Sequence, residues 1–307
     1  MGHYVIETKE LTKAYGKQLS VDHLNIHVPK GKIYALLGRN GAGKTTTMKL
    51  LLNLAAPTSG EIFLFGTPYN NFPTKTYRRI GAIIETPSFY ENLTAAENLE
   101  IIARLRGKHK RNTINDALGI VGLDTAGKKI VKEYSLGMKQ RLGIAAAIMH
   151  EPELLILDEP INGLDPVGIH EIREFLLSLC TEKGTTILIS SHVLGEIEQM
   201  ADIIGVMHEG HLLEETSMPD LHKHNRKYVE FHVSNVNKAA CVVEQKFHIS
   251  DYMIMDHRTI RLFERTEQSS DINSSFVKND ISVTGINQRE ETLEDYFCKL
   301  IGGDGIA

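Results

Sequence analysis

The chain has few cysteines, no long apolar run and no excess of basic residues. Its three cysteines, Cys180, Cys241 and Cys298, are scattered over 307 residues without metal-ligand spacing, which is typical of reduced thiols. No stretch approaches the roughly 18 apolar residues that span a membrane, and the N-terminus shows no signal peptide. The net charge of −5 gives no basic footprint, so we expect no nucleic-acid partner. If the protein works at a membrane, we expect a partner to hold it there.

A glycine-rich segment stands between an expected strand, Ile33–Leu37, and a helix expected to begin at Lys44. It matches the pattern G-x-x-x-x-G-K-[ST] in every fixed position. Glycines let backbone N–H groups wrap closely around a phosphate, and a helix N-terminus adds partial positive charge. We expect Lys44 to reach the β- and γ-phosphates of ATP and Thr45 to ligate Mg²⁺. The alternative, an ordinary glycine-rich turn, is disfavoured by the strand before it and the helix after it. The expected ATP-binding residues of this loop are Gly38, Arg39, Asn40, Gly41, Ala42, Gly43, Lys44, Thr45 and Thr46.

An apolar run, Leu154–Leu157, ends in two acids, Asp158 and Glu159. The carboxyl end of a strand is where an open α/β sheet presents its ligand crevice. Asp158 is therefore expected to hold Mg²⁺, and Glu159 to polarise an attacking water as the catalytic base. A strand that ends in two acids is common in α/β proteins, and only the phosphate loop upstream makes this pair specific.

A second anion site is indicated at Ser135, which precedes a helix rich in small residues. A serine N-cap and a helix N-terminus together can hold a phosphate. Taken alone, these residues also fit a plain N-cap. The chain thus has one phosphate loop and a second, separate phosphate-binding device.

Five ordered motifs resemble those of the ATP-binding cassette (ABC) ATPases: Gly38–Thr46, Ser135–Arg141, Leu154–Pro160, Asn162–Asp165 and Ser190–His192. The resemblance implies that Tyr15 stacks on adenine and that His192 contacts the γ-phosphate as a catalytic residue. It also implies that Ser135, Gly137 and Asp165 serve ATP bound to the opposite subunit. Locally, Tyr15 fits turn packing equally well, and Asp165 is also an N-cap followed by proline. The implied partner is a second copy of the chain or a paralogous ATPase.

Two departures from the ABC pattern are informative. The signature reads Ser-Leu-Gly-Met-Lys from Ser135, which puts in doubt the contacts of the second glycine and the glutamine in the usual Ser-Gly-Gly-Gln. Glu85 stands where most members have glutamine, as in the ATPase subunits of bacitracin-type exporters and lantibiotic immunity systems. We expect Glu85 to reach a Mg²⁺-bound water and to take part in catalysis. The alternative is a solvated loop acid.

The order of elements indicates an α/β protein with a second, smaller domain. The resemblance implies a P-loop NTPase with a RecA-like parallel sheet, an N-terminal antiparallel β subdomain and an α-helical signature subdomain. We expect this cassette over residues 1–219, a linker over 220–227 and an α+β domain over 228–307. The last domain is expected to follow the ferredoxin-like order β-α-β-β-α-β. Elements expected within the cassette are strands 4–8, 20–28, 33–37, 154–157, 185–189 and 203–208, and helices 44–54, 95–105, 113–121, 137–149, 166–181 and 193–200.

The resemblance implies an ATP-hydrolysing subunit that powers export of a peptide antibiotic through a separate permease. It would lie at the cytoplasmic face of the cell membrane. One rival is a non-transport ABC ATPase, against which the single cassette and the acidic balance argue. Another is an ATP-gated sensor whose C-terminal domain binds a ligand, which rests on fold-level analogy alone.

Overall fold

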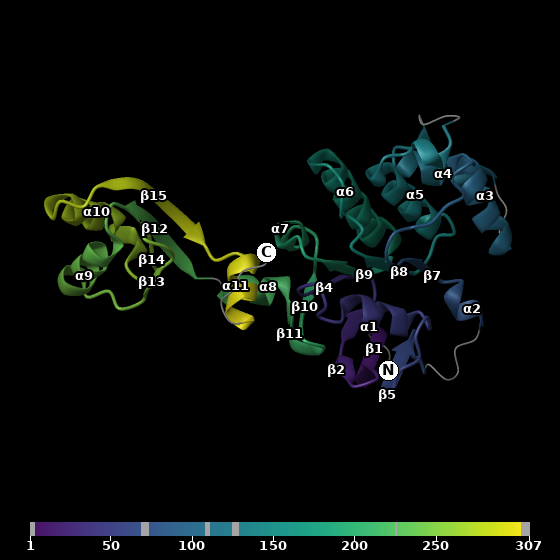
Figure 1. The fold of residues 1–307 in the computed structure, drawn as a ribbon, viewed down its shortest axis with the longest axis horizontal. Coiled ribbons are helices and arrows are strands. Elements are labelled where there is room, and N and C mark those ends of the chain that lie inside the picture. The colour runs from purple at the N-terminus through teal and green to yellow at the C-terminus, as the bar shows by residue number, and fades with distance from the viewer. Residues whose placement is uncertain (1–3, 69–73, 108–110, 125–128, 225, 302–307) are drawn as a thin grey trace. The chain divides into compact units, whose positions relative to one another are not determined.

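The protein divides into two compact units, which we describe separately. The structure is a computed structural model, and it describes residues 4–68, 74–107, 111–124, 129–224 and 226–301. Unit 1 runs to Pro219 and unit 2 begins at Asp220 (Figure 1). Helix α8 (Met218–His224) covers the first part of the segment expected as a linker, 220–227, and residue 225 lies outside the described residues. Met218 and Leu221, three residues apart, are both buried and give this polar segment the apolar side that a helix needs.

The central sheet of unit 1 is built on buried, uninterrupted apolar strands. Its spatial order is β11-β10-β4-β9-β8-β7; β10 to β7 are parallel, and β11 pairs antiparallel at the edge. Every residue of β4, β8 and β9 is buried, as expected for strands covered on both faces. The strands are β4 (Ile33–Leu37), β7 (Ile80–Ile83), β8 (Leu154–Asp158), β9 (Thr186–Ser191), β10 (Ile203–His208) and β11 (His211–Ser217).

A second, antiparallel sheet lies at the N-terminal end of unit 1. Its strands are β1 (Tyr4–Tyr15), β2 (Gln18–Leu24), β3 (His27–Pro29), β5 (Ser59–Leu64) and β6 (Thr67–Pro68). The single strand expected over 20–28 is two strands, because the Thr8 hydroxyl donates to the Leu24 carbonyl and accepts from the Ile26 amide between them. One apolar core, which includes Ile6 of β1 and Ile156 of β8, joins this sheet to the central one.

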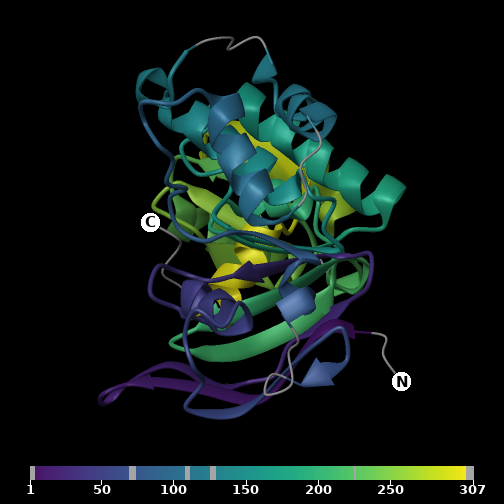
Figure 2. The same ribbon diagram turned by 90° about the vertical axis from the view of Figure 1, so that its right-hand side faces the viewer.

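The helices of unit 1 fall into a group around the sheets and a second group, of which α5 packs against β7. Figures 1 and 2 both show α3, α4 and α5 together, at the end of unit 1 opposite the antiparallel sheet. Helix α1 packs against β8 and ends at Leu51 rather than Leu54, since Asn53 takes a left-handed φ of 58°. Among the described residues, no helix is long and apolar enough to cross a membrane. The helices are α1 (Lys44–Leu51), α2 (Thr74–Tyr77), α3 (Ala95–Leu105), α4 (Arg111–Ile120), η3 (Val131–Glu133), α5 (Leu136–Ile148), α6 (Pro166–Lys183) and α7 (Leu194–Glu198).

Unit 2 is a four-stranded antiparallel sheet with its own core. The sheet order is β13-β14-β12-β15. Phe231 of β12 and Phe276 of α10 meet edge to face at 5.2 Å in that core. On β14, Arg261 bonds Glu230 at 2.9 Å and Asp295 of α11 at 2.7 Å. The expected order β-α-β-β-α-β is present, while the ferredoxin-like assignment stays a prediction. The elements are β12 (Lys227–Val233), α9 (Val236–Phe247), β13 (Tyr252–Ile254), β14 (Thr259–Leu262), η4 (Thr266–Gln268), α10 (Ser269–Lys278), β15 (Val283–Glu290) and α11 (Leu293–Leu300).

Candidate functional site

The glycine-rich loop connects β4 to α1 at the carboxyl edge of the central sheet. A Cβ added at Gly38 would lie 2.5 Å from the carbonyl oxygen of Met207, so the loop begins where only glycine fits. Gly43, the N-cap of α1, has a φ of 106°, and a Cβ there would clash with the carbonyl oxygen of Ser20. Gly41 also has a positive φ, of 84°. The backbone conformation and the close neighbours of this loop therefore require glycine at these positions. A loop that wraps closely around a phosphate has the same requirement.

Lys44 is a buried cation inside this loop. Its Nζ donates to the carbonyl oxygens of Gly38 at 2.5 Å and Arg39 at 3.3 Å, and lies 3.7 Å from Glu159 Oε1. Burial lowers the pKa of Lys44, and the Glu159 and Asp158 carboxylates offset part of that effect. A phosphate oxygen is a stronger acceptor for this ammonium than a neutral carbonyl. An anion bound in the loop would therefore give the Lys44 ammonium a stronger acceptor than the carbonyls it contacts now.

Asp158, at the end of β8, accepts hydrogen bonds from two hydroxyl groups. Thr45 Oγ1 donates to Asp158 Oδ2 at 2.8 Å, and Ser190 Oγ donates to Asp158 Oδ1 at 2.6 Å. A carboxylate beside a hydroxyl fits Mg²⁺, which binds few protein oxygens and takes the rest from phosphates and water. Consistent with such an incomplete set, the described residues contain no group of three or more His, Cys, Asp or Glu side chains able to hold a metal ion. The residues present fit Mg²⁺ bound together with a nucleotide.

Glu159 is held by contacts on several sides in a strained conformation. Its φ is 48°, in the left-handed region that a residue with a Cβ rarely adopts. Its amide donates to Ser190 Oγ at 2.9 Å, and its Oε2 lies 2.8 Å from His192 Nδ1. Such strain persists where the surroundings fix it, which is common at functional sites. The pair Glu159–His192 thus forms a fixed acid and imidazole next to Lys44.

Glu85 follows β7 at the same edge of the sheet, with a φ of 60°. Its Oε1 lies 2.5 Å from Lys49 Nζ on α1, and 64% of its side chain is exposed. The structure therefore gives this acid a specific cation, which sequence reasoning did not identify.

Tyr15 is the last residue of β1 and is 51% exposed. Lys13 Nζ lies 4.8 Å from the centre of its ring. An aromatic ring with this exposure has room for a stacking partner. Two of the loop residues, Asn40 and Thr46, are exposed and half-buried respectively.

Ser135, Gly137 and Asp165 form a second group. Ser135 caps α5 by accepting from the Met138 amide at 3.3 Å, and Asp165 caps α6 by accepting from the Gly168 amide at 3.2 Å. These three residues line one cavity of about 690 Å³. The structure therefore brings the signature and Asp165 side by side within one chain.

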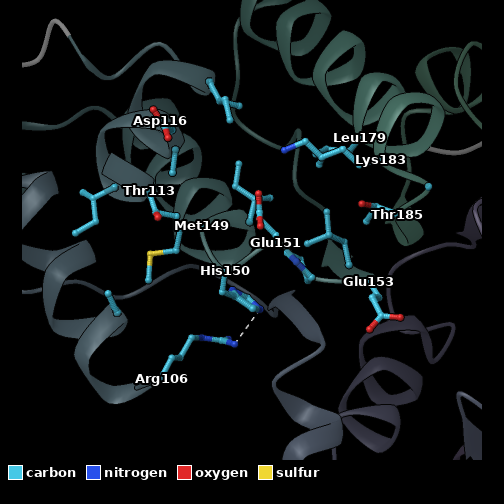
Figure 3. Close-up of a pocket in the computed structure, with 18 of the residues that line it drawn as sticks. Arg106, Thr113, Asp116, Met149, His150, Glu151, Glu153, Leu179, Lys183 and Thr185 are labelled. Carbon is cyan, nitrogen blue, oxygen red and sulfur yellow. Dashed lines mark hydrogen bonds between the residues drawn. The ribbon is translucent and has the colours of Figure 1, made fainter. Parts of the chain in front are cut away.

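Another cavity, of about 930 Å³, lies at the opposite edge of the sheet. Pro152 and Thr185, which line it, stand just before the amino ends of β8 and β9 (Figure 3). Arg106 and His150 meet inside it at 2.9 Å. None of the predicted site residues lines this cavity. Cavity volume alone would therefore not have located the phosphate loop as the functional site.

Sequence reasoning missed two polar residues of the site, Ser190 and Lys49. Ser190 belongs to a motif that was noted, Ser190–His192, but only its histidine was given a role. Its hydroxyl connects Asp158 to the backbone of Glu159. Lys49 follows Thr45 by four residues, a helical spacing that places both on one face of α1. That spacing was the available signal.

A parallel sheet with a phosphate loop and a hydroxyl–carboxylate pair at its carboxyl edge defines a P-loop nucleotide-binding protein. Residues 21–162 match the family model described as ABC transporter. The chain is 60% identical over 304 residues to the bacitracin transport ATP-binding protein BcrA of Enterococcus faecalis, which covers 99% of this chain and 98% of that protein. It is 47% identical over 211 residues to the lantibiotic transport ATP-binding protein SrtF of Streptococcus pyogenes, which covers 69% of this chain and 90% of that one. A solved ATP-binding subunit of an ABC transporter matches with a TM-score of 0.65 and 32% identity, over 71% of this chain and 92% of that one.

The chain therefore belongs to the ATP-binding proteins of ABC transporters. The expected fold class of the cassette is confirmed, and so is the expected activity class, an ABC-type ATP hydrolase.

Proposed function

We propose that this chain is the ATPase subunit of a bacterial exporter that moves a peptide antibiotic through a separate permease. The observation that carries the proposal is the extent of the likeness to the bacitracin transport protein. That likeness covers 99% of the chain, including unit 2, whereas the family model ends at residue 162. The relative named for lantibiotic transport supports the same class of cargo.

In the proposed mechanism, Lys44 and the loop amides hold the phosphates of ATP. Thr45 and Asp158 would hold Mg²⁺, and Glu85 is the third residue assigned to it. When bound, Mg²⁺ neutralises charge on the phosphates. The pairing of Thr45 Oγ1 with Asp158 Oδ2 at 2.8 Å supports this assignment.

Glu159 is the proposed base that orients the attacking water and takes its proton. Its Oε2 is directed by His192 at 2.8 Å, and its Oε1 lies 3.7 Å from Lys44. His192 fixes the direction of Glu159 and contacts the γ-phosphate.

The proposed ATP site is completed by a second copy of the chain or by a paralogous ATPase. Tyr15 stacks on the adenine, while Ser135, Gly137 and Asp165 of the opposite subunit meet the γ-phosphate. This proposal is supported by the presence of two phosphate-binding groups in one chain. The second group includes the N-caps of α5 and α6 and lines a cavity of its own. ATP binding would close such a dimer, and hydrolysis would reopen it. The permease would hold the dimer at the cytoplasmic face of the membrane.

Glu159→Gln tests the catalytic assignment. We expect the variant to keep its affinity for ATP while steady-state hydrolysis falls by at least about a hundredfold. Normal hydrolysis by this variant would rule out Glu159 as the base. Melting temperature with and without ATP controls for folding.

Drug susceptibility tests the cargo. A sensitive host would carry the permease genes with either the wild-type chain or Glu159→Gln, and growth would be scored against bacitracin and a lantibiotic. We expect higher tolerance of one of these drugs with the wild-type chain alone. Equal tolerance of both drugs in the two strains would refute antibiotic export and leave the ATPase assignment standing.

A further inference from the structure

Lys49 lies on the same face of α1 as Thr45, one helical turn further along. Side chains four residues apart are neighbours on a helix, and they lean toward its N-terminus. The Lys49 side chain is thereby directed toward the edge of the sheet where Thr45 meets Asp158. Its ammonium ends 2.5 Å from Glu85 Oε1, in the loop after β7.

Glu85 brings a third carboxylate to an edge of the sheet that already holds Asp158 and Glu159. Lys44 is the cation that faces Glu159 there, at 3.7 Å. A nucleotide adds further negative charge when it binds. An uncompensated acid at position 85 would therefore repel both the neighbouring carboxylates and the phosphates.

The Glu85–Lys49 pair contributes little to folding but is well suited to direct a side chain. Lys49 is 33% and Glu85 64% exposed at the side chain, and ion pairs that water reaches this freely add little stability. Glu85 also has a left-handed φ of 60°, a strained backbone conformation that is common at functional sites. We therefore expect the pair to affect nucleotide binding more than the stability of the fold.

We propose that Lys49 is a positioning residue that makes an acid usable at position 85. It neutralises Glu85 and holds that carboxylate against α1, beside the nucleotide site. This inference rests on the proposed function, in which Glu85 belongs to the ATP site. It assigns to the chain a second lysine that tunes the affinity for nucleotide without binding it.

A double-mutant cycle on the full chain tests this role. The variants are Lys49→Met, Glu85→Gln and the two combined, and the probe is the fluorescent nucleotide TNP-ATP, titrated in EDTA and again in Mg²⁺. In EDTA we expect Lys49→Met to weaken binding several-fold, because the freed Glu85 carboxylate repels the phosphates. In Mg²⁺ the loss should be smaller, because the cation offsets the charge of the phosphates and of the freed Glu85.

The double variant has no net charge at this pair, so it should bind TNP-ATP several-fold more tightly than Lys49→Met. Lys49→Arg should restore binding. Lys32→Met is the matched control: Lys32 pairs with Asp202 at 2.8 Å, is half exposed and lies at the opposite end of β4. This control should bind TNP-ATP like the wild type.

A double variant that binds no more tightly than Lys49→Met would overturn the proposal, because Lys49 would then act on the nucleotide or the fold directly. Unchanged affinity of Lys49→Met in EDTA would overturn it as well. If Lys49→Met does not fold, Lys49→Gln takes its place in the cycle. The cycle measures binding alone, so its failure is distinguishable from a failure of the catalytic assignment, which Glu159→Gln reports.

Discussion

Ser190→Ala should lower the free energy of unfolding more than the loss of one oxygen atom suggests. Ser190 is fully buried, and its hydroxyl makes two hydrogen bonds at once. It donates to Asp158 Oδ1 at 2.6 Å and accepts from the Glu159 amide at 2.9 Å. The substitution removes one oxygen atom and leaves a buried carboxylate oxygen and a backbone N–H each without that partner.

The size of the effect follows from these two contacts. A hydrogen bond to a charged group contributes about 1.5–3 kcal/mol, and an unsatisfied buried donor costs about 1–3 kcal/mol. Allowing for partial relaxation, we expect a loss of about 3 kcal/mol in the free energy of unfolding. For a unit of this size, each kcal/mol lowers the melting temperature by about 2–4 °C. The expected decrease is therefore about 6–12 °C.

The neighbouring Ser191 provides a matched control. It is equally buried, and its hydroxyl accepts from the Val193 amide at 3.0 Å. Ser191→Ala leaves one backbone donor unpaired and no carboxylate affected, so about 1 kcal/mol is expected. Calorimetry on both variants and the wild type, at one pH and without nucleotide, measures the difference.

A melting temperature for Ser190→Ala equal to that of Ser191→Ala would refute the reasoning. It would mean that the contacts to Asp158 and Glu159 contribute no more than one ordinary backbone hydrogen bond. A decrease at least twice that of the control would support it.

Three further outcomes are expected. Gly43→Ala should abolish TNP-ATP binding, because the new Cβ clashes with a carbonyl oxygen at a φ of 106°, whereas Gly195→Ala, in open space, should bind normally in the same titration. Affinity for ATP should fall as pH rises through the lowered pKa of Lys44, below the ordinary 10.5, because only the protonated ammonium attracts phosphate; titrations across this range should show no such fall for Lys44→Met. His192→Ala should lower steady-state hydrolysis by roughly ten- to a hundredfold; unchanged hydrolysis would contradict its role in directing the base.

Two strands of the central sheet could be predicted because each follows an uninterrupted apolar run. The runs Ile33–Leu37 and Leu154–Leu157 are strands β4 and β8 as expected. Strand β7 escaped prediction because it contains Gly81 and Ala82, which are poor strand formers. Gly81 is required there, since a Cβ would clash with the Ala147 carbonyl of α5. Tertiary packing, rather than strand propensity, sets this segment.

Sequence motifs likewise predicted the main residues of the site but not the contacts between them. The phosphate-loop pattern predicted Lys44, and the two acids at the end of an apolar strand predicted Asp158 and Glu159. His192 was implied only by the resemblance to the ABC ATPases. Spacing does not reveal which side chains meet across strands, so the partners of Asp158 and Glu159 had to come from the structure. The pairing of Glu85 with a helix residue was hidden for the same reason.

The order of the strands explains why Ser190 occupies the centre of the site. Strand β9 lies between β4 and β8, although β9 follows both in sequence. Its register pairs Ser191 with Leu37 on one side and Ser190 with Asp158 on the other, so the three strands end at nearly the same level. A slip of one residue in β9 would turn the Ser190 side chain to the other face of the sheet. The hydrogen bond from Ser190 to Asp158 therefore favours one register over its neighbours. A residue that fixes strand register in this way also fixes where Asp158 and Glu159 stand relative to the phosphate loop.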